Sequence, residues 1–169
     1  MKQYAQLAAW IYDPLNYPCP VGRMVRLNKR KNLAIVYDEG KIYIVCRGTQ
    51  TKKDVLTDVA LGFGFIEWTT RFERVEKWLK PYLPQKQNVV LIGHSLGGTL
   101  ATEVGMKYGV ESQTFNSGKS PFTILVPGRR NPRSREYRNA FDPVSLFGAF
   151  EPHVRTRRFT PEHSISSFT

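Results

Sequence analysis

The amino-acid sequence predicts an α/β protein in which a mostly parallel sheet, with an N-terminal hairpin, is flanked by helices. Two observations lead to this class. Runs of β-branched residues alternate with segments of helical periodicity, which is the pattern of strands joined by helices. The run from Val89 to Ile92 is apolar throughout, as in a parallel strand that is covered on both faces. The 169 residues, 41% of them hydrophobic, suit a single domain over residues 1–169.

The first expected elements are a helix and the hairpin. The helix ends at Asp13-Pro14, and its apolar residues follow an i, i+3, i+4 rhythm: Tyr4, Leu7, Ala8, Ile11 and Tyr12. Residues 18–32 are predicted as a basic loop, because the prolines at its start disfavour helix. Two β-like runs, 33–37 and 42–46, flank the sequence Asp-Glu-Gly-Lys at 38–41, which predicts a β-hairpin.

Two helices are expected next. Residues 51–61 suit a short polar helix, and residues 65–79 suit a longer one that is closed by Pro81 and Pro84. The apolar face of the longer helix consists of Trp68, Phe72, Val75, Trp78 and Leu79. Aromatic residues at this spacing are typical of a buried core face, so we do not assign them to a cofactor.

The second half of the chain continues the alternation. After the buried strand at 89–92 comes a predicted helix over 96–108, which ends at Gly109. Three further strands are expected at 113–115, 136–141 and 153–159. Each parallel strand delivers the following loop to the same edge of the sheet, where active sites of α/β proteins are built.

Composition limits the location of the protein and the state of its thiols. No apolar run approaches the ~18 residues of a membrane-spanning helix. The first twelve residues lack the uninterrupted apolar region of a secretory signal peptide, so a cytoplasmic protein is expected. Cys19 and Cys46 could pair, but Cys46 ends an apolar run and is predicted to be a buried free thiol.

The charge of the chain favours an anionic partner. Its 25 Lys and Arg against 14 Asp and Glu give a formal net charge of +11, and basic residues gather at 23–31, 129–138 and 155–158. A nucleic-acid partner is not expected, because no zinc-finger, RNA-recognition or helix-turn-helix pattern accompanies the charge. The clusters either keep the surface soluble or allow peripheral contact with an anionic membrane.

The sequence Gly93-His94-Ser95-Leu96-Gly97 is the most informative motif. It fits the G-x-S-x-G pattern and falls between the buried strand and the next helix, where a nucleophilic serine projects from a tight turn. The glycines let the two backbones cross, and the helix directs free N–H groups toward an oxyanion at Ser95. We therefore predict an α/β-hydrolase-type sheet with Ser95 as nucleophile; an idle glycine-rich turn is the alternative.

A serine nucleophile requires a histidine base within hydrogen-bond reach. His94 lies inside the turn and is expected to pack or to make a local hydrogen bond. His163 follows the last predicted strand and suits a loop that folds back over the carboxyl ends of the sheet, so it is predicted as the base. His153 lies at that strand beside a proline and remains the alternative.

The acid that orients the base is predicted to be Asp142. Hydrolases of this type run in the order Ser, Asp or Glu, His, and Asp142 follows a predicted strand between Ser95 and the histidine. Glu151 and Glu162 are weaker alternatives. An Asp before Pro could also simply start a turn.

These residues resemble the class 3 lipases, the family of the fungal triacylglycerol lipases. The matching segments are residues 42–49 (IYIVCRGT) with Leu56-Thr57-Asp58-Val59, residues 90–98 (VLIGHSLGG), Thr114-Phe115-Asn116-Ser117 and Asp142-Pro143-Val144. The resemblance implies that Thr49 and the backbone N–H of Leu96 donate to the oxyanion, and that Asp58 has a structural role. Family members are longer, so it also implies a short version with a minimal cap.

We therefore expect a serine hydrolase that cleaves carboxylic esters, above all those of lipids such as acylglycerols or phospholipids, through an acyl-enzyme. The expected site consists of Ser95, Asp142 and His163, with Thr49 and Leu96 at the oxyanion, and needs no metal or organic cofactor. One alternative is a hydrolase of soluble esters or thioesters. The other is an inactive hydrolase fold whose basic surface binds lipid or nucleic acid.

Overall fold

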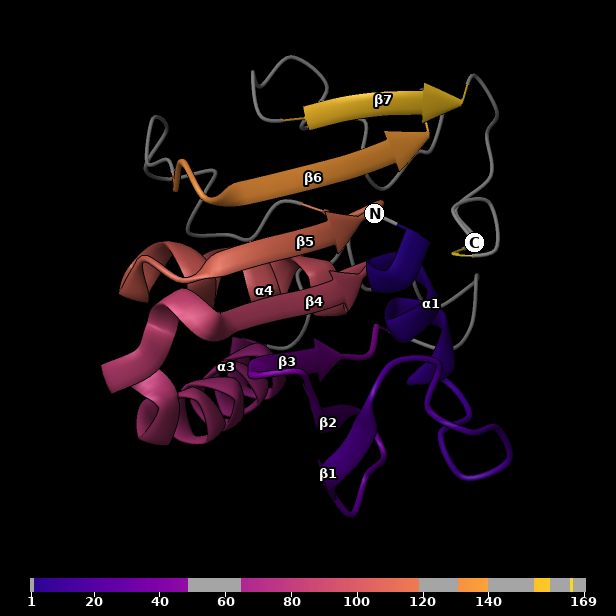
Figure 1. The fold of residues 1–169 in the computed structure, drawn as a ribbon. Helices are drawn as coiled ribbons and strands as arrows, with labels where there is room; N and C mark the ends of the chain where they lie inside the picture. Colours follow the sequence, from indigo (N-terminus) through magenta and orange to yellow (C-terminus); the bar gives the residue numbers. More distant parts are fainter. Residues whose placement is uncertain (1, 49–64, 119–130, 140–153, 159–164, 166–169) are drawn as a thin grey trace.

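The computed structural model describes residues 2–48, 65–118, 131–139, 154–158 and 165 of the chain (Figure 1). Its strands are β1 (Arg23–Leu27), β2 (Leu33–Asp38), β3 (Lys41–Cys46), β4 (Val89–His94), β5 (Glu111–Phe115), β6 (Ser134–Asn139) and β7 (Val154–Arg158). Its helices are α1 (Lys2–Trp10), α3 (Phe65–Leu79), α4 (Leu96–Tyr108) and the 3₁₀ helix η1 (Lys80–Asn88).

Within these ranges the strands form one mixed sheet in the order β1-β2-β3-β4-β5-β6-β7. The strands β1, β2 and β3 are antiparallel, and β3 to β7 run parallel. The predicted α/β class, the hairpin of β2 and β3 and the three later strands are thereby confirmed. The carboxyl ends of the five parallel strands lie at one edge of the sheet.

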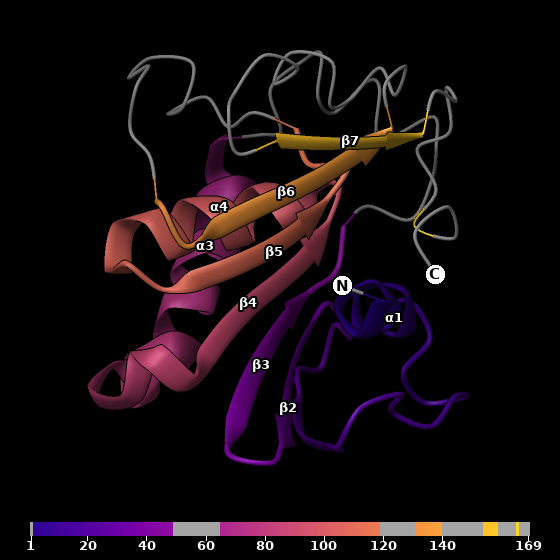
Figure 2. The ribbon, with the colours of Figure 1, turned by 45° about the horizontal axis from the view of Figure 1, so that its top comes forward.

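The molecule has three layers, with α1 on one face of the sheet and α3 and α4 on the other (Figure 2). Strand β4 shows why its sequence is apolar throughout. Val90 and Ile92 join the core on the α1 side, whereas Val89 and Leu91 join the core under α3 and α4. All four are at most 2% exposed, so the prediction of a strand covered on both faces is confirmed.

The predicted helices at both faces have the expected core residues. On α1, Leu7 and Ala8 are fully buried against the sheet. On α3, whose bounds match the predicted 65–79, Val75, Trp78 and Leu79 pack into the core, and Phe72 is partly buried against it. Helix α4 ends as predicted at Gly109, which has the left-handed backbone (φ 65°) that favours glycine.

Two elements differ from the sequence-based expectation. Residues 23–27 were expected in a loop but form β1, which pairs antiparallel with β2. This edge strand exposes its first four residues and therefore lacks the apolar alternation that identifies a strand. The 3₁₀ helix η1 was not expected. Helix α3 itself ends at Leu79, as the prolines predicted, and Pro81 lies in the first turn of η1, where the missing N–H would have no intrahelical acceptor.

The two cysteines are free thiols on opposite faces of the sheet. Cys46 is buried with the core under α3 and α4, and Cys19 packs against the core on the α1 side. Burial raises the pKa of the Cys46 thiol to about 12, which keeps it protonated. The prediction of a buried free thiol at Cys46 is confirmed.

The remaining structural expectations fall on other parts of the chain. The predicted polar helix at 51–61 and the segment that the resemblance assigns to a cap lie outside the described residues. Among the residues that are described, no helix is long and apolar enough to cross a membrane.

Candidate active site

Ser95 occupies the sharp turn between the end of β4 and the start of α4. Its backbone has φ 54° and ψ −128°, a conformation that costs a non-glycine residue about 1–3 kcal/mol. Neighbouring backbone holds it there: the Ser95 N–H donates to the carbonyl of Phe115 (3.0 Å), and the Ser95 carbonyl accepts from the N–H of Thr99 (3.0 Å). The turn is thus fixed by β5 and by the first turn of α4.

The glycines of the motif allow the backbones around Ser95 to touch. A Cβ at Gly93 would collide with the carbonyl group of Gly97, and a Cβ at Gly97 would collide with the carbonyl oxygen of Cys46. A Cβ at Gly98 would come within 2.8 Å of the Cβ of Ser117. The first turn of α4 therefore rests directly on the ends of β3 and β4, as the motif predicted.

Gly48, the middle residue of Arg47-Gly48-Thr49 (the RGT segment), also lies against the serine turn. A Cβ at Gly48 would lie 2.5 Å from the carbonyl oxygen of His94 and 3.0 Å from the Cβ of Ser95, so only glycine fits. Thr49, the predicted oxyanion donor, follows Gly48 directly and lies outside the described residues. Its predicted partner, Leu96, is the first residue of α4, so its N–H is one of those without an intrahelical acceptor.

The segment before Gly48 is anchored from two directions. The Arg47 N–H donates to the carbonyl of Asn32 (3.0 Å), and its guanidinium donates to the carbonyl of Lys31 (3.3 Å). The Arg71 guanidinium of α3 donates to the carbonyl of Arg47. Backbone that is held in this way can present hydrogen-bond donors without rearranging during a reaction.

Tyr12 is a residue of the site that sequence reasoning missed. Its hydroxyl lies 2.9 Å from Nδ1 of His94, its ring meets the imidazole edge-on, and a Cβ at Gly48 would lie 2.8 Å from the same hydroxyl. Burial raises the pKa of Tyr12 to about 12, so the hydroxyl stays neutral. The periodicity placed Tyr12 on the apolar face of the first helix; the additional signal was that a buried tyrosine hydroxyl needs a polar partner.

His94 has the role that was expected of it. The imidazole is 6% exposed, so it packs as expected, and it makes a hydrogen bond to Tyr12, which lies 82 positions away along the chain. The contacts of Tyr12 with His94 and Gly48 thus connect the turn after α1 to the serine turn and to the segment that contains Gly48.

The turn after β5 packs beside the serine turn. Asn116 has a positive φ of 44°; its N–H donates to the carbonyl of Tyr137, and its side-chain oxygen accepts from the N–H of Asn139. On α4, the hydroxyl of Thr99 donates to the carbonyl of Gly118 (2.9 Å). These bonds tie the carboxyl ends of β5 and β6 to the helix that carries Ser95.

The other predicted site residues lie outside the described part of the chain. They are Asp142, His163 and their alternatives His153, Glu151 and Glu162, together with Asp58. Ser95 and Leu96 are described, and the structure brings them together with Gly48.

Comparisons with known proteins agree with the fold. The model of the Tle-like phospholipase domain, described as phospholipase-like, matches residues 28–140. Lipase II from Rhizopus niveus superposes with a TM-score of 0.63 at 21% sequence identity, over 86% of this chain and 74% of that one. The lipase from Rhizopus microsporus var. chinensis gives a TM-score of 0.59 at 20% identity, over 84% of this chain.

The chain spans 66% of the length of the Rhizopus microsporus lipase, slightly less than two thirds. No curated protein matches the sequence. The two lipases support the predicted resemblance at the level of the fold, and the family match covers well over half of the chain. The chain belongs to the family of the Tle-like phospholipase domain.

Proposed function

We propose that this protein is a serine hydrolase that cleaves the carboxylic ester bonds of lipids, with phospholipids as the first substrate class. The observation that carries the proposal is the backbone of Ser95, held at φ 54° between a buried parallel strand and a helix N-terminus. Strain of this kind persists only where the surrounding structure imposes it, and it concentrates at active sites.

The proposed reaction follows from the chemistry of the residues. The Ser95 hydroxyl oxygen attacks the ester carbonyl carbon while His163 takes its proton, and Asp142 orients the imidazole. The tetrahedral intermediate collapses, and the leaving alkoxide receives the proton from His163. Water, deprotonated by His163, then attacks the acyl-enzyme, releases the fatty acid and restores Ser95.

The described strands support the choice of Asp142 and His163. Asn139 ends β6 and pairs with Arg158, which ends β7, so the chain leaves both strands at the edge where β4 delivers Ser95. Asp142 follows Asn139 by three residues, and His163 follows Arg158 by five. Both residues therefore belong to the loops expected to build this edge.

Ile165 supports His163 over His153. Its side chain packs against the core cluster on the α1 side, and so does that of Tyr12, the partner of His94. The chain thus returns from β7, the outermost strand, to the α1 face of the sheet two residues after His163. His153 instead precedes β7.

The contact between Gly48 and Ser95 supports the proposed oxyanion site. Thr49 follows Gly48 in the chain, and Leu96 follows Ser95. Donors from Thr49 and Leu96 would therefore approach the same oxygen, that of the substrate's ester carbonyl. Preorganised donors aimed at a developing charge contribute about 2.7–4 kcal/mol each to lowering the barrier.

The substrate class rests on the names of the relatives. The family model describes a phospholipase-like domain, which favours phospholipids, and the structural neighbours are lipases, which makes acylglycerols the second class. Soluble esters or thioesters are the remaining alternative.

The test is to measure fatty-acid release by mass spectrometry from phospholipid vesicles, triacylglycerol emulsions and a soluble butyrate ester. The native protein is compared with Ser95→Ala, His163→Ala and the control His153→Ala. We expect phospholipid hydrolysis that falls by several orders of magnitude in the first two variants and stays near native in the third. Release that survives Ser95→Ala contradicts the mechanism, and activity on the soluble ester alone assigns the alternative class.

A further inference from the structure

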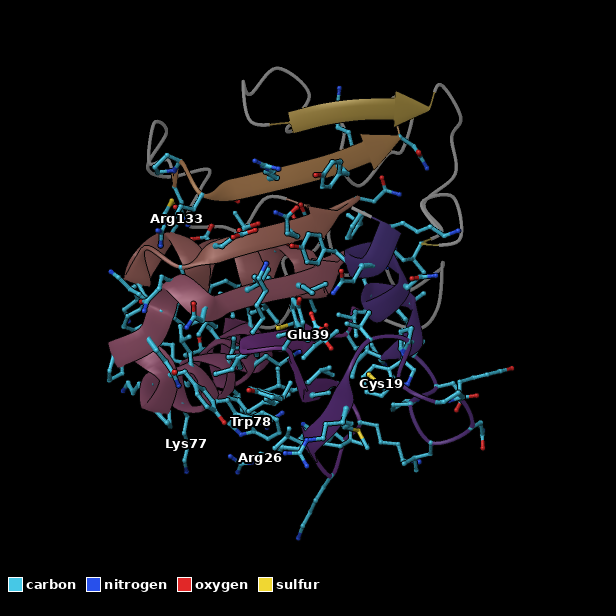
Figure 3. All side chains as sticks on the ribbon, in the orientation of Figure 1. Cys19, Arg26, Glu39, Lys77, Trp78 and Arg133 are labelled. Atoms are coloured by element: carbon cyan, nitrogen blue, oxygen red, sulfur yellow. The ribbon has the colours of Figure 1, made fainter. Side chains whose placement is uncertain are left out.

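A basic cleft of about 570 Å³ lies between α3 and the turn that joins β1 to β2. None of its lining residues belongs to the serine turn. Its charged lining residues are the cations Arg26, Lys29, Arg30, Arg74 and Lys77 and the single carboxylate Glu73. Figure 3 shows Arg26, Trp78 and Lys77 at this end of the molecule.

Arg26 is held in place by an aromatic ring. Its guanidinium carbon lies 4.2 Å from the centroid of the Trp78 ring, and Trp78 itself is buried at 6% exposure. Stacking occupies the flat face of a guanidinium and leaves its N–H donors free at the edge. Arg26 thus offers a fixed fork of donors at the cleft, suited to two oxygens of one ligand.

Arg74 carries a buried donor that is not satisfied. Its Nη1 atom is buried and has no hydrogen-bond partner within the described part of the chain. Buried polar atoms are nearly always hydrogen-bonded, and a charged group without an acceptor is costly. The Arg74 side chain lines the cleft, so an anionic ligand there would offset the positive charge of this guanidinium.

The cleft keeps its positive charge because acidic partners are few. Among the described residues, the one salt bridge on α3 joins Glu76 to Lys107 on α4, and none joins Glu73 to a cation of the cleft. Five cations against one carboxylate favour a ligand with more than one negative charge. Phosphoryl groups combine that charge with the oxygen geometry that arginine binds.

We propose that this cleft is a binding site for a phosphate-bearing ligand, whose phosphoryl oxygens are held by Arg26, Arg74 and Lys77. The site is separate from the ester-hydrolysing centre and does not depend on the proposed function. The ligand is either a soluble phosphorylated compound or the headgroup of a phospholipid, and both present the same chemistry to the cleft.

Calorimetric titration with inorganic pyrophosphate tests the proposal, because it requires no turnover. Arg26→Gln and Lys77→Gln should each weaken binding about tenfold, the value of a charged hydrogen bond. The matched controls are Arg23→Gln on the same strand and Lys80→Gln just after α3; both side chains are exposed and outside the cleft. The controls should change binding less than about twofold, and Glu73→Gln should tighten it.

Sedimentation with vesicles of phosphatidic acid in phosphatidylcholine separates the two sources. Pyrophosphate binding without vesicle binding assigns a soluble ligand. Vesicle binding that weakens in Arg26→Gln and Lys77→Gln but not in the two control variants assigns a lipid headgroup. Absence of both, or equal losses in the cleft variants and their controls, overturns the proposal.

Discussion

The backbone of Ser95 adopts the mirror image of an ordinary extended conformation, which glycine enters freely and other residues avoid. Removing the side chain should therefore relieve strain, whereas removing the hydroxyl alone should not. We expect Ser95→Gly to be more stable than Ser95→Ala by about 1 kcal/mol, after the greater chain entropy of glycine is subtracted. Urea unfolding of the two variants measures this difference, and equal midpoints would contradict a strained turn.

The buried hydroxyl of Tyr12 makes the stability of the folded protein depend on pH in the alkaline range. Because its pKa in the folded protein, about 12, lies above the ~10 of an exposed tyrosine, the folded state holds this proton more tightly than the unfolded chain. The stability that depends on it is complete below pH 10 and is lost as the pH rises to 12. We expect the native protein to lose up to about 2 kcal/mol more than Tyr12→Phe between pH 9 and 12. Parallel stability curves for the two proteins would show that the hydroxyl is not buried in solution.

At the scale of elements, the contact between the end of β3 and the start of α4 joins the two sequence motifs. Gly48→Ala would place a methyl group against the carbonyl oxygen of His94, so the RGT segment would have to move. We expect kcat for ester hydrolysis to fall at least tenfold with little change in KM, because only the transition state uses the oxyanion donors. Steady-state kinetics measures the split; a change in KM alone would make this segment part of the substrate-binding surface.

The sequence predicted best those elements in which buried apolar residues recur at a regular spacing, because that spacing can be recognised in the element's own sequence. The longer helix at 65–79 and the strand at 89–92 are of this kind, since each has apolar residues wherever another layer covers it. Strand β1 was missed because it lies at an exposed edge and gains its structure from pairing with β2. Residues 23–27 therefore form a strand because they pair with β2, and their own side chains do not indicate it.

The same reasoning explains which part of the site was predictable. The serine turn is local, so one short motif indicated its strand, its helix and its glycines. The hydrogen bond between Tyr12 and His94 joins residues 82 positions apart, and no local pattern encodes it. The prediction of Asp142 and His163 depends on chain order and stays a prediction.

At the scale of the whole molecule, the net charge of +11 favours contact with an anionic membrane. One correction applies to the basic cluster at 129–138: Arg133 and Arg135 are exposed, but Arg138 is only 7% exposed and cannot serve a docking surface. Each basic residue near an anionic membrane contributes about 1 kcal/mol to binding, and salt screens the attraction beyond ~10 Å at 0.1 M.

We therefore expect hydrolysis of vesicles to rise with their anionic lipid content and to fall with salt, while the rate on a small neutral ester barely responds. Replacing Arg155, Arg157 and Arg158 together by Gln should flatten the salt dependence and leave the soluble-ester rate unchanged. Equal rates on neutral and anionic vesicles at low salt would show that the charge serves solubility instead.

The central claim is that Ser95 is an activated nucleophile, and reaction with a fluorophosphonate probe tests it most directly. Such a probe phosphonylates a serine only where a base removes the proton and donors stabilise the developing oxyanion, so it does not depend on the lipid substrate. We expect one adduct, mapped by mass spectrometry to the peptide that contains Ser95, and no labelling of Ser95→Ala. A folded native protein that remains unlabelled, or an adduct on another residue that persists in Ser95→Ala, would contradict the claim.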